Sequence, residues 1–289
     1  MSAFLLTVFS IYDIIYCIAY TGGDTVFQKI KSKASSILRK NLTENKVIAT
    51  YEEEGVTYKV IDTLSSSSLY KSQRSLKFKT ADSNIVYTHS SIYLDTEEKI
   101  QPYLPIGQEI ISRWCEAFSP KSALVLGCAG CAIPRFLCLS YSDIRVTGVE
   151  ISPLLIHIAK ELFLLRETDD RFALIEGDAF RYVKDCISAT EDIILVDIFD
   201  KNRLPDEVFS SAFISDIIRT ASDNSLILFN FIDSNPKNVK SFAEEIKLSF
   251  GEKYLISTET RCFLAVGKSE NSQKLGAFYK SLNNCEKIG

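Results

Sequence analysis

The residues from Ser122 to Glu150 constrain the fold of this 289-residue chain more than any other stretch. They run from an apolar segment, Ala123 to Leu126, through the small residues G-C-A-G-C-A into a helical segment and then a second apolar segment. An unbroken apolar run without alternation is typical of a parallel strand that is covered on both faces. The stretch therefore predicts a strand–turn–helix–strand unit of a parallel sheet.

The turn at residues 127–132 is expected to bind a ligand. Gly127 and Gly130 allow the backbone to turn sharply and to approach a ligand, because they carry no Cβ. Glu150 follows about 20 residues later at the end of a strand, where a carboxylate can accept hydrogen bonds from ribose hydroxyls. These features predict a nucleotide or nucleoside site; the alternative is a turn that is merely tightly packed.

Strands and helices alternate after residue 106, which predicts a doubly wound α/β sheet. The runs K-Y-L-I-S-T-E-T and R-C-F-L-A-V-G-K are separated by almost nothing and are expected to pair as an antiparallel hairpin at the sheet edge. Short alternating β-rich runs before residue 105 predict a small antiparallel β-domain. The expected organisation is an N-terminal apolar helix with a basic linker (1–45), the β-domain (46–105), a Rossmann-like domain (106–268) and a C-terminal tail, helical or loose (269–289).

Acidic residues follow the next two predicted strands, where ligands of doubly wound sheets bind. Asp178 could accept a hydrogen bond from a purine amine or could cap the following helix, and the sequence leaves both interpretations open. Asp197 closes the apolar run I-I-L-V, and Asp200 lies three residues on. Such a pair could hold an amine and accept its proton; the alternative is helix capping or an ion pair with Lys201 or Arg203.

The composition excludes several function classes. A net charge of -4 argues against a general nucleic-acid binder, and two histidines leave little scope for a histidine-based metal site, so no metal is expected. The eight cysteines are scattered and several lie in apolar stretches, which indicates reduced thiols in a cytoplasmic protein. Cys128-x-x-Cys131 has no second pair at zinc-site spacing, so small residues that fill a tight turn are favoured over a redox or metal pair.

The apolar segment at residues 3–21 approaches the length of a membrane span and precedes a basic segment. Asp13 would then lie in the middle of the bilayer, which costs about 2.5–3.5 kcal/mol. A docking or dimerisation helix is therefore favoured, and membrane contact through residues 3–21 remains the alternative.

The strand and small-residue turn, followed by V-E-I-S, E-G-D-A-F and D-I-I-L-V-D-I-F-D, resemble the class I S-adenosylmethionine-dependent methyltransferase fold, and most of all the spermidine synthase-like family of polyamine aminopropyltransferases. Upstream, Y-E-E-E-G-V-T-Y-K-V-I-D and Q-P-Y-L-P-I are also similar to that family. The resemblance implies that S-adenosylmethionine or decarboxylated S-adenosylmethionine is the cofactor. It also implies transfer of a methyl or aminopropyl group to a nucleophile, expected to be an amine, and a homodimer.

The resemblance further implies roles for individual residues. Asp197 would deprotonate the attacking amine beside the cofactor, and Asp200 would help to bind the amine. The cofactor-binding residues would be Gly127, Cys128, Ala129 and Gly130 around the methionine part, Glu150 at the ribose with Ile151 beside it, and Asp178 at the adenine amine with Ala179 beside it.

Two departures from the family pattern bear on the activity. The family carries an aspartate at the position of Gly130, and its segment D-E-x-x-Y-H-E is absent; the corresponding place reads L-D-T-E-E-K-I-Q-P-Y-L, where Asp95, Glu97, Glu98 and Tyr103 are candidates for a partial replacement. Because the segment D-E-x-x-Y-H-E is absent, ordinary S-adenosylmethionine is favoured over the decarboxylated form. The alternative function is a catalytically inactive binding or structural protein of the same fold.

Overall fold

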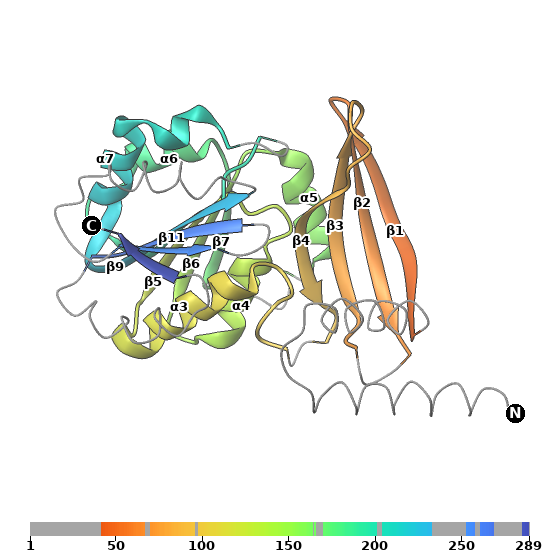
Figure 1. The fold of residues 1–289 in the computed structure, drawn as a ribbon, viewed down its shortest axis with the longest axis horizontal. Coiled ribbons are helices and arrows are strands. Elements are labelled where there is room, and N and C mark those ends of the chain that lie inside the picture. The colour runs from red at the N-terminus through yellow and green to blue at the C-terminus, as the bar shows by residue number, and fades with distance from the viewer. Residues whose placement is uncertain are drawn as a thin grey trace, which may run out of the picture.

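The structure, a computed structural model, describes residues 42–66, 70–95, 98–163, 165, 170–200, 204–232, 253–257, 261–268 and 285–288. It consists of a four-stranded sheet beside an eight-stranded sheet that carries helices on its faces (Figure 1). The apolar segment 3–21 lies outside the described residues. Among the described residues, no helix has the length and apolar character needed to cross a membrane.

The N-terminal sheet is antiparallel, as the alternating sequence predicted, and its strand order is β1-β2-β3-β4. Its apolar face packs on helix α5 (Pro153–Leu162) and includes Val60, Leu76 and Ile92 against Leu155 and Ile158. The strands are β1 (Thr43–Glu53), β2 (Val56–Ser65), β3 (Gln73–Thr80) and β4 (Tyr87–Tyr93).

The large sheet has the order β12-β10-β11-β9-β8-β5-β6-β7, and the strands from β9 to β7 are parallel. Its strands are β5 (Ser122–Leu126), β6 (Arg145–Glu150), β7 (Phe172–Glu176), β8 (Glu191–Val196), β9 (Ala221–Ile232), β10 (Lys253–Ser257), β11 (Arg261–Lys268) and β12 (Cys285–Ile288). The helices are α3 (Pro105–Phe118), α4 (Ala132–Ser140), α5 (Pro153–Leu162), α6 (Ala179–Asp185), the 3₁₀ helix η2 (Asp206–Phe209) and α7 (Ser211–Thr220). The expected doubly wound α/β class is confirmed.

Strand β5 shows why its sequence is apolar throughout. Ala123 and Val125 belong to the core under α3 and α4, whereas Leu124 and Leu126 belong to the core under α6 and α7 (Figure 1). Both faces are covered, so alternation with polar residues would place polar groups in one of the two cores.

The expected antiparallel hairpin is present, with β10 paired to β11 and β11 paired antiparallel to β9. A helical or loose tail was expected at residues 269–289, and this prediction was wrong for residues 285–288. Residues Cys285–Ile288 form β12, which pairs antiparallel with β10 and makes the edge of the sheet. The polar segment C-E-K-I carries little β pattern of its own; its strand conformation comes from backbone pairing to β10.

Candidate functional site

The turn after β5 is held tightly against the end of β8. Gly127 has φ +83°, and a Cβ there would lie 2.3 Å from the backbone oxygen of Asp197. Ala129 and Cys131 also have positive φ, of 44° and 56°. Gly127 is therefore required both by its backbone conformation and by the lack of space.

Glu150, at the end of β6, fixes this turn. Its Oε2 accepts hydrogen bonds from the backbone amides of Cys128 at 3.1 Å and Ala129 at 2.8 Å. Its Oε1 accepts one from the Ser152 amide at 3.0 Å. The carboxylate is buried and at the same time lines a pocket, so it can orient the turn and present its remaining lone pairs to a ligand.

Asp197, which follows β8, is a buried carboxylate held by two donors. The Asn230 side-chain amide donates to its Oδ1 at 2.6 Å, and the Tyr103 hydroxyl donates to its Oδ2 at 3.1 Å. These bonds fix the carboxylate at the carboxyl ends of the parallel strands, where it can accept a proton from a nucleophile.

Most of the residues expected at the site surround one pocket of ≈100 Å³, which we call the turn pocket. Eight of its lining residues are ones expected to bind the cofactor or to act in catalysis: Gly127, Cys128, Ala129, Glu150, Ile151, Asp178, Ala179 and Asp197. The others are His89, Tyr103, Val149, Leu155, Gly177, Phe180, Ile198 and Phe199. The volume is below the roughly 300–1,000 Å³ typical of small-molecule pockets, so a nucleoside would enter only if lining side chains moved.

Asp178 serves as a helix cap in this structure. Its Oδ1 accepts a hydrogen bond from the Arg181 amide at 2.8 Å at the start of α6. Because the same carboxylate lines the turn pocket, the two interpretations of Asp178 are compatible.

Gly130 and Asp200 lie apart from the turn pocket. A Cβ on Gly130 would lie 2.8 Å from the Ser90 Cβ and 2.9 Å from the Phe163 ring, so this residue allows β4 to approach the turn. An aspartate at this position would collide with the same neighbours. Asp200 is exposed and is not among the residues that line the turn pocket.

The two cysteines of the turn are buried and have free thiols. Burial, and then the adjacent Cys131 side chain, raise the pKa of the Cys128 thiol well above its ordinary value. A neutral thiol is a poor nucleophile and a poor metal ligand. Within the described ranges, no group of three or more His, Cys, Asp or Glu side chains is arranged to hold a metal ion.

Three residues of the site were not predicted in these roles: Asn230 and His89, and Tyr103, which was expected only as a partial replacement for the missing segment. Asn230 could have been found, because it is the polar residue within the apolar run S-L-I-L-F-N-F-I. His89 reaches the turn pocket from β4, and no local pattern of the chain predicts that contact.

Two buried glutamines position Tyr103. The Gln108 side chain, on α3, accepts from the Gln101 amide at 2.8 Å and donates to the Gln101 and Tyr103 carbonyls. The Gln101 side chain accepts from the Tyr93 amide at 3.1 Å and donates to two carbonyls of the preceding segment. These hydrogen bonds join the segment before Tyr103 to both the N-terminal sheet and α3.

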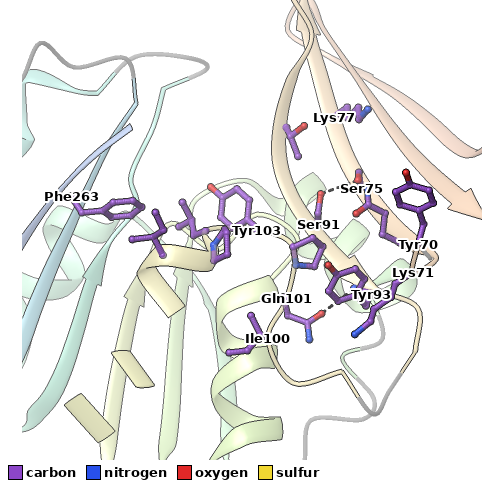
Figure 2. A pocket seen from close by; sticks show the side chains of 16 residues that line it. Tyr70, Lys71, Ser75, Lys77, Ser91, Tyr93, Ile100, Gln101, Tyr103 and Phe263 are labelled. Atoms are coloured by element: carbon purple, nitrogen blue, oxygen red, sulfur yellow. Dashed lines mark hydrogen bonds between the residues drawn. The ribbon is translucent and has the colours of Figure 1, made fainter. Parts of the chain in front are cut away.

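A larger cavity of ≈910 Å³, which we call the sheet pocket, lies between the N-terminal sheet and residues 100–106 (Figure 2). Strands β3 and β4 contribute polar side chains, among them Ser75 and Ser91, whose hydroxyls are hydrogen-bonded at 2.8 Å. Phe263 of β11 lies at its opposite end (Figure 2). Tyr103 lines both the sheet pocket and the turn pocket, so the two pockets meet at the residue that contacts Asp197.

Comparison with known proteins supplies the family context. No protein-family model matches the chain. The polyamine aminopropyltransferase of Chromobacterium violaceum is 33% identical over 127 residues, which are 44% of this chain and 48% of that protein. The polyamine aminopropyltransferase of Neisseria meningitidis is 29% identical over 156 residues, 54% of this chain and 59% of the relative. The chain thus matches about half the length of these curated relatives.

The crystal structure of a probable spermidine synthase from Corynebacterium glutamicum superposes with a TM-score of 0.64 and 18% identity. It covers 84% of this chain and 91% of that chain, so the shared fold includes both sheets. The chain resembles the spermidine synthase-like family. The expected resemblance is confirmed, and so is the expected fold.

Proposed function

We propose that this spermidine synthase-like chain is a transferase that binds S-adenosylmethionine or its decarboxylated form and transfers an alkyl group to a nucleophile, an amine in our proposal. The observation that carries the proposal is Asp197, a buried carboxylate held by Asn230 and Tyr103 where the two pockets meet. A homodimer and a cytoplasmic location stay predictions.

The donor set of the turn pocket fits an adenosyl cofactor. Glu150 can accept hydrogen bonds from ribose hydroxyls, and Asp178 can accept one from the exocyclic amine of adenine. Gly127, Cys128 and Ala129 line the same pocket, so the backbone of the turn can lie close to the methionine part. When bound, the cofactor would supply an electrophilic carbon on a sulfonium.

Tyr103 and Asp197 would act on the acceptor. In the transfer, a bond forms from the acceptor nitrogen to the carbon, the carbon–sulfur bond breaks, and its electron pair goes to sulfur. Asp197 accepts the proton that the nitrogen loses, and Tyr103 orients the carboxylate. Catalysis in this scheme depends mainly on how the acceptor nitrogen is positioned relative to the electrophilic carbon.

Ordinary S-adenosylmethionine is the preferred donor in this proposal. The aspartate of the family turn is replaced by Gly130, where Ser90 and Phe163 leave no room for a side chain. A cationic aminopropyl chain would therefore find no carboxylate at that position of the turn.

One observation favours a second candidate, an inactive binding or structural protein of the same fold. The turn pocket holds only ≈100 Å³, and Glu150 already accepts three backbone hydrogen bonds. Such a protein would use the turn for packing.

Isothermal titration with S-adenosylmethionine, decarboxylated S-adenosylmethionine, methylthioadenosine and NAD tests the proposal. Tighter binding of S-adenosylmethionine supports methyl or another alkyl transfer, and tighter binding of the decarboxylated form supports aminopropyl transfer. If no adenosyl compound binds, the transferase proposal fails and the second candidate stands.

A further inference from the structure

We propose that the acceptor carries an anionic group, which Lys77 binds in the sheet pocket, and that it is therefore not a diamine or polyamine. This inference rests on the proposed transferase function, because it assigns the acceptor of the same reaction. It reverses the charge preference that the names of the curated relatives would suggest.

The charge of the sheet pocket is the first observation. Of the described residues that line it, Lys71 and Lys77 are charged and none carries a carboxylate. The other polar lining groups are hydroxyls and amides, from Gln73, Ser75, Thr88, Ser91, Tyr70, Tyr93, Gln101 and Tyr103. A second ammonium group of a diamine would lie beside lysines without an anionic partner, which is unfavourable.

The two lysines differ in their partners. Lys71 forms an ion pair with Glu98 and lies 5.4 Å from the centre of the Tyr93 ring, so its charge is already compensated. Lys77 forms no ion pair with any described residue, and it is half-buried on β3. Lys77 is therefore the cation of this pocket that can bind an anion.

Strand register strengthens the assignment. Lys59 of β2 is paired directly with Lys77 in the antiparallel ladder, and Lys59 likewise forms no ion pair within the described part of the chain. Like charges at directly opposed positions destabilise a sheet. An anionic group at Lys77 would relieve this repulsion, whereas a cationic group would add to it.

The position of Tyr103 connects this anion site to the reaction. Figure 2 shows Lys77 on the sheet at one side of the cavity and Tyr103 on the segment that faces it. The Tyr103 hydroxyl contacts Asp197. An acceptor would thus place its nucleophilic amine at Tyr103 and Asp197 and its anionic end at Lys77.

Matched probes test the charge preference. Putrescine, γ-aminobutyrate and n-butylamine share one amine end and have a cationic, anionic or apolar far end. Their homologues longer by one methylene form a second set. Binding to the full chain, with S-adenosylhomocysteine present, is measured by isothermal titration or ligand-detected NMR at up to millimolar concentrations. The aminocarboxylates are expected to bind about tenfold more tightly than the diamines, because they gain a charge-assisted contact.

Variants assign the preference to one residue. Lys77→Gln is expected to abolish it, and Lys77→Glu to reverse it in favour of the diamines. Lys79→Glu is the matched control, because Lys79 is two residues along the same strand and does not line the sheet pocket. It should leave the preference unchanged. Thermal unfolding shows whether each variant is folded.

The inference is overturned if the wild-type chain binds the diamines as tightly as the aminocarboxylates, if no probe binds, or if Lys79→Glu has the effect of Lys77→Glu. These outcomes are separate from failure of the transferase proposal, which is judged by adenosyl-compound binding alone. If no adenosyl compound binds, the same probes are titrated in the absence of S-adenosylhomocysteine. A preference for the anionic probes that depends on Lys77 then still supports the anion site.

Discussion

The turn pocket and the sheet pocket meet at Tyr103 but are built in opposite ways. The turn pocket is small, at ≈100 Å³, and its walls are strand ends and a backbone turn that is fixed by Glu150. The sheet pocket is ≈910 Å³ and is lined mainly by polar side chains of the N-terminal sheet and the chain that follows it. The first therefore depends on backbone geometry, and the second on which side chains project from a surface.

This difference teaches where variation is tolerated. A change in the turn alters the path of the backbone between β5 and α4 and is expected to affect folding. A change on the open face of β3 replaces one side chain on an intact strand, so it can alter which acceptor is bound. Substitutions at the turn and at the junction of the pockets test this contrast.

The largest effect is expected at the point where the pockets meet. Asp197→Asn should lower kcat about a thousandfold, because the attacking amine loses the base that takes its proton. Binding of the adenosyl compound should be retained. Asp200→Asn is the matched control: Asp200 is exposed and lies outside the turn pocket, so a loss below about tenfold is expected. Steady-state kinetics with the identified donor and acceptor measure both, and equal losses would contradict the assignment of Asp197 as the base.

The backbone character of the turn pocket predicts the next effect. Gly127→Ala should lower the free energy of unfolding by about 3 kcal/mol, because a Cβ would meet the Asp197 carbonyl and φ is positive. In Gly177→Ala the new Cβ meets nothing within 4 Å, so a change within about 0.5 kcal/mol is expected. Urea unfolding compares the two. A Gly127→Ala protein as stable as the control would show that the turn can relax.

Gln108 holds the segment that carries Tyr103, the residue at which the two pockets meet, and its side chain is fully buried. Gln108→Leu should cost about 2 kcal/mol of unfolding free energy, because the backbone groups of Gln101 and Tyr103 lose their partners. Glu109→Gln, an exposed change on the same helix, should be close to neutral. If urea unfolding finds the two variants equally stable, the glutamine does not fasten this segment.

The smallest effect concerns access to the turn pocket. The raised pKa of Cys128 keeps its thiol neutral at pH 8, and the thiolate fraction rises with pH. Alkylation of Cys128 by iodoacetamide should be at least about tenfold slower in the folded chain than in urea, and it should still be accelerating above pH 8. Mass spectrometry of the modified peptides gives both rates. Equal rates in the folded and unfolded chain would show that the pocket opens readily.

The sequence allowed prediction of features that depend on local pattern. The apolar run Ala123–Leu126, the glycines of the turn and the acidic residues at the strand ends all lie within one strand–turn–helix unit or at equivalent points of the next units. Their convergence then follows from the parallel sheet, in which the carboxyl ends of the strands share one edge.

The remaining features depend on contacts between distant residues. Tyr103 and Asp197 are 94 positions apart, and their contact depends on the buried amides that direct the intervening segment. Ser90 approaches Gly130 only because the N-terminal sheet packs on α5. Strand β12 was not predicted, because its partner β10, and not its composition, makes it a strand.

The placement of β11 between β9 and β10 separates the order of synthesis from the order of assembly. As the chain leaves the ribosome, β10 emerges before the strand that joins it to the rest of the sheet. The backbone groups of β10 cannot enter the ladder until β11 has emerged and paired with β9. A released chain truncated before Arg261 should therefore leave β10 unprotected, and a chain that includes β11 should protect it.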